Sequence, residues 1–397
     1  MLSLAVFAAQ SAVFIVPPLL VEIATDLEVS VAVAGQLATA TFAAWAVSLI
    51  CVGPLSDSFG RRPVALVGLT ILFASVLASA FAPNIETLLA LRMLTGLAGG
   101  TLPPTAVGVV SDVISPARRA QAVTAILALN AVVSATTVPL VAVLADLGDW
   151  RLPFLVTALL LASGLLTNWI WFPKDSRNRL RGFAFFSRYV SLLSLRFFRV
   201  AIVVGTTQRI AFWATLSFFP AHLILTYDVP LGLVAVPLVI TAAGQIVGSY
   251  SAAYVAKNRY RAALIASTSI VGGVCSFLFF SVHLGLWTAV AVVAVAAAFL
   301  SVAIPAMVAA STEYSGESKS TGASLMGLSN QSGGALGAAI AGVLLASLGY
   351  AGIGYLCLAV TVACALMTPF FGRQFGESAG RFAGPGPSVP QPERGGD

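Results

Sequence analysis

The sequence predicts an all-α membrane protein with about twelve transmembrane helices in two pseudo-symmetric six-helix bundles. The first observation is composition: 58% of the 397 residues are hydrophobic and only 9% are charged, whereas about a quarter of a soluble domain is charged. The second is that apolar runs of about 20 residues recur along the chain, and a helix of that length crosses a bilayer. The third is a repeat, because similar stretches recur 200 positions apart between apolar runs.

The apolar runs are predicted to be helices because a chain in lipid must satisfy each backbone N–H and C=O within itself, and the alternation of a β-barrel is absent. Charges, prolines and glycines separate the runs and so indicate where helices end. In chain order the predicted spans are 2–24, 33–54, 63–82, 86–109, 120–144, 151–172, 197–221, 231–255, 262–281, 284–308, 321–347 and 350–371. Two glycine pairs, Gly244 with Gly248 and Gly333 with Gly337, predict close helix packing.

The longest stretch between runs is basic and divides six predicted spans from six. Matching places in the two halves hold "GPLSDSFGRRPVAL" from position 53 and "AYVAKNRYRAALIA" from position 253. Two six-span halves share one topology, so an axis along the membrane normal relates them, as in one group of secondary transporters. The predicted domains are an N-terminal bundle at 1–172, a basic cytoplasmic linker at 173–196, a C-terminal bundle at 197–372 and a disordered cytoplasmic tail, rich in Pro and Gly, at 373–397.

Charge predicts the orientation of the chain, because loops rich in Lys and Arg stay in the cytoplasm. The basic loops hold Arg61, Arg62, Arg118, Arg119, Lys174, Arg177, Arg179, Arg181, Arg188, Lys257, Arg259, Arg261, Lys319 and Arg373. The opposite loops hold Asp26, Glu28, Glu86, Asp146, Asp149 and Asp228, with Arg151. We therefore expect a multi-pass protein of the plasma (inner) membrane with cytoplasmic N- and C-termini. The net charge of +6 is spread over membrane-edge loops, so we expect no nucleic-acid partner.

The sequence does not predict an enzyme. It contains no HExxH, GxSxG, GxGxxG or Walker-type motif, and its four cysteines fall within spans without metal-ligand spacing. His222 and His283 lie near the outer ends of helices, where water contact explains them. We expect no cofactor and no metal.

One short charged stretch, "GPLSDSFGRRP", lies between the second and third predicted spans. It matches the G-x-x-x-D-x-x-G-R-R signature of the major facilitator superfamily, which the chain resembles. The matching residues are Gly53, Asp57, Gly60, Arg61 and Arg62. Three more stretches resemble the twelve-helix drug–proton antiporter branch: "RMLTG" in the fourth span, "PLLVEIATDLEVS" after the first and "DWRLPF" before the sixth. The resemblance implies the major facilitator fold, with two bundles rocking around a central site.

The resemblance also gives the charged loop a role. In the family this loop locks the cytoplasmic side in the outward-facing state, and here the role would fall to Asp57 and Arg61. Asp112 at the inner end of the fourth span is at the right depth to accept a hydrogen bond from Arg61. The N-terminus of the eleventh span near Thr321 offers a positive dipole end to Asp57. The second half has Lys257 in place of Asp57, so only the first copy can act this way. The alternative is that the arginines simply hold the loop inside.

The chain departs from the antiporter branch in two places. The branch carries a glycine-rich run in its fifth helix, but here Ser134, Val138, Ala142 and Val143 occupy the glycine places beside Pro139. The first span also lacks the acid that many multidrug members carry there. These departures leave proton antiport and drug export open.

A charge at the bilayer centre costs about 2.5–3.5 kcal/mol, so each such residue is a functional candidate. Arg209 lies near the middle of the seventh span, where the alternative is that it snorkels to an edge. The resemblance gives Arg92, in the fourth span, a role in coupling. Glu22 is the acid nearest to Arg92 by depth, so we expect the two to approach each other in at least one state; otherwise Glu22 is an ordinary interfacial acid. The candidates for the substrate cavity, or for hydrogen bonds between helices, are Gln36, Trp45, Asn130, Gln208, Arg209, Trp213, Gln245, Asn330 and Gln331.

The predicted function is secondary active transport of a small organic solute by alternating access, as an exporter coupled to protons. The first alternative is an importer or facilitator of a sugar or organic anion, since Arg92 and Arg209 lie among few buried acids. A more distant alternative is a membrane sensor or scaffold that does not transport. The expected partners are a small-molecule substrate, the lipid bilayer and protons, and we expect a monomer.

Overall fold

The computed structural model describes residues 1–172, 190–257, 260–314 and 319–376, and every regular element in these ranges is helical. In chain order the elements are α1 (Leu2–Phe14), the 3-10 helix η1 (Pro17–Leu19), α2 (Leu20–Asp26), α3 (Val31–Phe59), α4 (Arg61–Ser79), α5 (Ile85–Gly99), α6 (Leu102–Val113), α7 (Pro116–Leu147), α8 (Arg151–Trp171), α10 (Arg196–Tyr227), α11 (Leu231–Lys257), α12 (Arg261–Ser281), α13 (Leu286–Leu300), α14 (Ala303–Tyr314), α15 (Lys319–Leu348) and α16 (Tyr350–Gly376). The predicted all-α fold is confirmed.

Eleven segments of the described chain are helical, apolar and long enough to cross a membrane. The predicted fifth span falls on α7, which is 32 residues long and whose strongly apolar part is Val132–Leu147. With α7, the helices account for the twelve predicted spans.

Three of the predicted spans are interrupted rather than continuous. The first contains η1, where Pro17 and Pro18 lack the N–H groups that an α-helix requires. The fourth breaks between α5 and α6, where prolines occupy the first turn of α6. The tenth breaks at the corresponding place, between α13 and α14.

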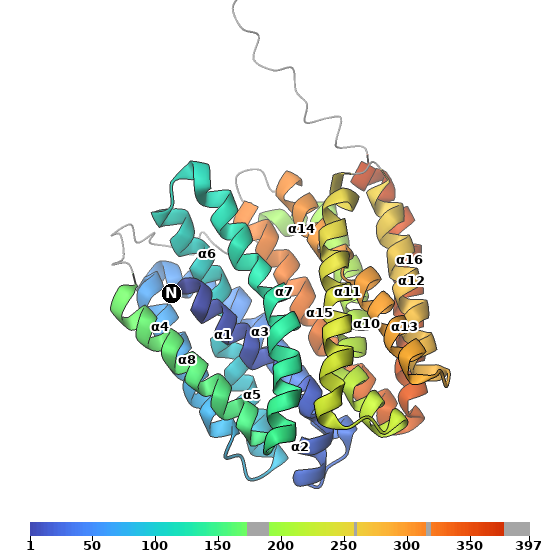
Figure 1. Cartoon of the computed structure of the whole chain (residues 1–397). Coiled ribbons are helices and arrows are strands. Elements are labelled where there is room, and N and C mark those ends of the chain that lie inside the picture. The colour runs from blue at the N-terminus through green and yellow to red at the C-terminus, as the bar shows by residue number, and fades with distance from the viewer. Residues whose placement is uncertain (173–189, 258–259, 315–318, 377–397) are drawn as a thin grey trace, which may run out of the picture.

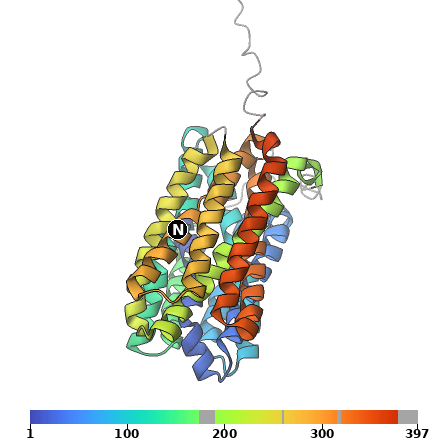
Figure 2. The same ribbon diagram turned by 90° about the vertical axis from the view of Figure 1, so that its right-hand side faces the viewer.

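The 200-residue repeat predicted from the sequence is visible in the helices. α3 and α11 begin at Val31 and Leu231, and α4 and α12 begin at Arg61 and Arg261. The helices from α1 to α8 form one half of the molecule and those from α10 to α16 form the other, as the two colour ranges in Figure 1 show. Figure 2 shows α11, α12 and α16 side by side along the C-terminal half. The most extensive contacts between the halves are those of α3 along α15 and of α7 along α11; α10 also contacts η1, α2 and α3.

Helix ends differ from the predicted limits by a few residues. α16 continues to Gly376, four residues into the segment predicted to be a disordered tail, and 190–194 is helical within the predicted linker. The rest of the linker and of the tail lies outside the described residues. The domain limits therefore stay a prediction.

The glycine pairs lie at close helix contacts. A Cβ on Gly244 or Gly248 of α11 would collide with the carbonyl oxygen of Ala294 or Ala298 in α13. A Cβ on Gly333 would collide with the Arg209 side chain, and one on Gly337 with the backbone at Ile210. Small residues thus let α11 approach α13 and α15 approach α10.

Candidate functional site

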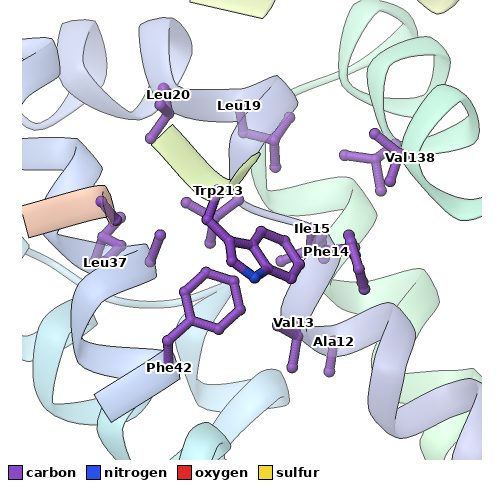
Figure 3. Close-up of a cluster of buried hydrophobic side chains, with 14 of the residues drawn as sticks. Ala12, Val13, Phe14, Ile15, Leu19, Leu20, Leu37, Phe42, Val138 and Trp213 are labelled. Carbon is purple, nitrogen blue, oxygen red and sulfur yellow. The ribbon is translucent and has the colours of Figure 1, made fainter. Parts of the chain in front are cut away.

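Three aromatic side chains meet where the two halves touch, as Figure 3 shows. The ring of Trp213 in α10 lies 5.6 Å from that of Phe14 in α1 and 4.5 Å from that of Phe42 in α3, between centroids. All three side chains are buried. We call Phe14, Phe42 and Trp213 the aromatic cluster. It joins the first, second and seventh spans at one point in the interior.

A polar chain from α15 reaches this cluster. The indole Nε1 of Trp213 donates a hydrogen bond of 3.4 Å to Oδ1 of Asn330, whose Nδ2 donates one of 3.2 Å to Oε1 of Gln331. Two sequence-predicted candidates, Trp213 and Asn330, are therefore in contact. An amide pair beside an aromatic surface can hydrogen-bond a polar group on a ligand whose apolar part packs on the rings.

The halves also meet toward the end of the molecule that carries α2, at the bottom of Figure 1, which we call the α2 end. There the ring of Phe218 packs over Gly35, and the amide of Gln36 packs against Gly342 of α15. The carboxylate of Asp146, at the end of α7, packs over Gly232 in the first turn of α11. Gln36, a predicted cavity residue, thus lies in the contact between the halves.

One hydrogen bond links the halves between α7 and α11. Ser134 donates to Oε1 of Gln245 at 3.2 Å, and the Ser134 side chain is buried. Gln245 was predicted as a cavity or helix-contact residue, and it makes a helix contact. In the sequence, Ser134 was notable only as a departure from a glycine-rich run, so its partner was not predicted.

Arg209 is buried within the C-terminal half and does not reach a membrane edge. Its Nη2 donates a hydrogen bond of 3.1 Å to the carbonyl oxygen of Leu300, and its guanidinium lies 4.1 Å from the centroid of the Phe212 ring. Gln208 donates to the same oxygen at 2.7 Å. Leu300 is the last residue of α13, where carbonyl groups lack intrahelical partners. The two side chains therefore supply hydrogen-bond donors to a carbonyl oxygen that the break in the tenth span leaves free.

Arg92 is fully buried inside the N-terminal half. Its Nη1 donates to the carbonyl oxygen of Ala12 at 3.1 Å, and its Nη2 donates to Oγ of Ser79 at 2.8 Å. Its guanidinium also lies 5.0 Å from the centroid of the Phe154 ring. In this conformation Arg92 makes no ion pair with Glu22 within the described residues. The approach of the two side chains in another state stays a prediction.

Glu22 lies in the first turn of α2 and is half-buried. Its Oε2 atom is buried without a hydrogen-bond partner among the described residues. A buried carboxylate oxygen without a donor is costly when ionised.

The charged loop forms the turn from α3 to α4. Gly60 has a φ of 92°, a backbone conformation that other residues rarely adopt. The Arg61 guanidinium packs over Gly108 of α6, one helical turn before Asp112, and Arg62 donates to the carbonyl oxygen of Trp169 in α8 at 3.0 Å.

Part of the predicted site lies outside the described residues. The backbones of Gly53, Asp57, Asp112 and Asn130 are helical. The side chains of Asp57, Asp112 and Asn130 are not described, so their predicted contacts stay predictions. Trp45 is buried against Gly99 and Gly100 within the N-terminal half.

Comparison with known proteins places the chain in a family. Residues 2–296 match the sequence model of the Major Facilitator Superfamily. Over 175 residues the chain is 29% identical to Multidrug resistance protein D of Escherichia coli, and over 105 residues it is 37% identical to the MFS-type transporter YybF of Bacillus subtilis. The matches cover 44% of the first relative and 26% of the second, so the chain matches less than half of either.

The fold also resembles solved structures. A bacterial homolog of the human lysosomal transporter Spinster, in an inward-facing and unoccupied conformation, superposes with a TM-score of 0.74 at 16% identity. The match covers 94% of this chain and 96% of that one. The family match, the helices and this likeness agree: the chain is a multi-pass membrane protein that belongs to the Major Facilitator Superfamily.

Proposed function

We propose that this transporter moves a small organic solute out of the cell by alternating access, in exchange for protons. The observation that carries the proposal is the aromatic cluster, which two halves share and which lies beside Asn330 and Arg209. A buried apolar surface with a few polar groups is the usual composition of a small-molecule site. The name of the Escherichia coli relative supports export, and the absence of an ATP-binding motif from the sequence leaves ion or solute gradients as the energy source.

Alternating access requires contacts between the halves that exist in only one state. In the orientation that the loop charges predict, the α2 end faces outward. The contacts of Gln36 with Gly342 and of Asp146 with Gly232 then close the outer side. Opening outward breaks these contacts together with the Ser134–Gln245 hydrogen bond.

Glu22 is the proposed proton carrier. It lies beside the closed outer contacts, on α2, which also touches α10 of the other half. When the halves separate, water reaches the buried carboxyl oxygen, and the free-energy cost of ionising Glu22 falls. For exchange, Glu22 would take up a proton from outside while the outer side is open and would be buried in its uncharged form when that side closes. The proton would then leave toward the cytoplasm before the outer side opens again.

The second candidate function is import or facilitated passage of a sugar or organic anion. Arg209 supports the anion, because it is a buried cation close to the aromatic cluster. A non-transporting sensor with the same fold is the third candidate, and it predicts ligand binding without flux.

Flux into proteoliposomes tests the proposal. The purified protein is reconstituted and a panel of radiolabelled organic cations, anions, sugars and neutral amphipathic compounds is offered, with protein-free liposomes as the control. We expect saturable flux of at least one solute, accelerated by an opposing proton gradient and abolished by a protonophore. Saturable flux that does not depend on the proton gradient would establish a facilitator. Flux no higher than the control for every solute of the panel would contradict transport.

A further inference from the structure

Arg209 is a cation in the interior that has no anionic partner among the described residues. Its side chain is only 4% exposed. Between positions 197 and 312 the sequence contains one acidic residue, Asp228, and between 318 and 376 it contains none. Asp228 follows Arg209 by nineteen residues along α10, which is about 28 Å of helix. Arg209 makes no ion pair in the described part of the chain.

The contacts of Arg209 and Gln208 use only part of the hydrogen-bonding capacity of these two side chains. The Arg209 guanidinium donates one hydrogen bond, to the Leu300 carbonyl, and its Nε is buried without a partner. Gln208 is fully buried. Its Oε1 accepts no hydrogen bond, and its Nε2 carries a second N–H beyond the one that bonds the Leu300 carbonyl, so Nε2 is the Gln208 atom that can donate to a carboxylate. Since Gln208 Nε2 and Arg209 Nη2 share the Leu300 oxygen, the two side chains lie side by side. A planar guanidinium can bind a carboxylate through two N–H groups at once.

The neighbourhood of Arg209 defines what else a ligand would meet. Trp213 lies one helical turn further along α10, on the same side of the helix. The Phe212 ring lies against the guanidinium, and α15 presents Asn330 to the Trp213 indole. A carboxylate on Arg209 thus has an aromatic surface within one turn of helix.

We propose that Arg209 and Gln208 form the binding site for the carboxylate of an organic anion whose aromatic or apolar body packs on Trp213. This inference rests on the proposed transport function and specifies its substrate class. Binding moves the guanidinium from the Leu300 carbonyl to the ligand, so substrate binding and the capping of the α13–α14 break compete. Ligand binding in the central site is thereby linked to the conformation of the tenth span.

Arg92 does not offer an equivalent site. Its Nε is also buried without a partner, but both of its Nη atoms already donate hydrogen bonds, to Ala12 and Ser79, and the side chain is fully enclosed. It lies inside one half rather than next to a contact between halves. The difference between the two arginines makes the proposal specific to Arg209.

Binding of benzoate, compared with benzamide, tests the proposal on the purified full-length protein. The two probes have nearly the same shape, but only benzoate is charged. We expect calorimetry and thermal denaturation to show that benzoate binds and stabilises the protein and that benzamide does not. In Arg209→Gln, benzoate affinity should fall about a hundredfold. Arg199→Gln is the matched control, because Arg199 is an exposed arginine of the same helix and its loss should leave affinity unchanged.

A second variant keeps the proposal testable if Arg209→Gln does not fold. Gln208→Glu places a carboxylate beside the guanidinium and so fills the site from within. We expect this variant to denature at a higher temperature than the wild type and to lose benzoate binding. A lower denaturation temperature together with retained benzoate binding would overturn the proposal.

The outcomes separate this inference from the transport function. Saturable flux of neutral or cationic solutes without benzoate binding would overturn the anion site and leave the proposed function intact. Benzoate binding that depends on Arg209, without flux of any solute, would support the site and contradict transport. Benzoate binding that persists unchanged in Arg209→Gln would overturn the site.

Discussion

Ser134 of α7 donates a hydrogen bond to Gln245 of α11 and so links the two halves of the transporter across their contact. Ser134 occupies a place where the antiporter branch that the sequence resembles carries glycine, which cannot make such a bond. The hydrogen bond is therefore a feature of this chain, and in the proposed cycle it breaks when the halves separate.

Ser134→Ala should favour opening at the α2 end. A hydrogen bond of this kind contributes about 1 kcal/mol, which changes the ratio of two states about fivefold. A reporter cysteine replaces Gln36 in a Cys51→Ser background; this position is half-buried against Gly342 when the α2 end is closed. Its labelling by a water-soluble thiol reagent should be about fivefold faster in Ser134→Ala. Thr136→Ala is the control, because Thr136 is exposed on the same helix and bonds only its own Val132 carbonyl; equal labelling rates in the two variants would contradict the prediction.

Gly248→Ala should weaken the C-terminal half. The added Cβ meets the backbone oxygen of Ala298, which cannot move without shifting α13. We expect a loss of about 1–3 kcal/mol of stability, seen as a lower denaturation temperature. Gly285→Ala is the control, because a Cβ there meets open space. If the two variants denatured at the same temperature, the close packing of α11 on α13 would not be important for stability.

Glu22→Gln should remove proton coupling while leaving binding intact. The uncharged amide mimics the protonated acid, so transport should no longer respond to an imposed pH gradient. Flux measured with and without the gradient checks this. Glu28→Gln, an exposed acid shortly after α2, should behave like the wild type. A Glu22→Gln variant that keeps the wild-type gradient dependence would exclude Glu22 as the proton carrier.

Asp57→Asn tests the latch that the family resemblance implies. The variant keeps Arg61 and Arg62, and hence the charges that orient the loop. We expect correct insertion, slower transport and faster labelling of a cysteine on the cytoplasmic side of the cavity. Wild-type transport and labelling would leave the loop with an orienting role alone.

The sequence predicted the spans and the repeat because both depend on composition along the chain. Lipid requires long apolar helices, and the charged loops divide them. The breaks in the first, fourth and tenth spans were missed. Pairs of prolines or glycines, such as Pro17 with Pro18, could have indicated the breaks. Hydropathy alone predicts one continuous helix for each apolar run.

The contacts of the site depend on packing between distant segments and could be predicted only in part. Trp213, Gln208, Arg209 and Asn330 were recognised because polar groups are rare in spans. Phe14 and Phe42 were missed, because one phenylalanine in an apolar helix resembles any other until its neighbours are known. The Leu300 carbonyl was unpredictable for a further reason: it is a backbone group that became available only through the break in the tenth span.

Reversible cross-linking of the α2 end tests alternating access most directly. Cysteines replace Gln36 and Gly342, which are in contact between α3 and α15, in a Cys51→Ser background, and a short thiol cross-linker that contains a disulfide joins them. The flux measured is that of the panel solute which the uncross-linked protein transports fastest. Flux should fall to the level of protein-free liposomes when the cross-link forms and recover when a reducing agent cleaves it. Undiminished flux through fully cross-linked protein would contradict the account.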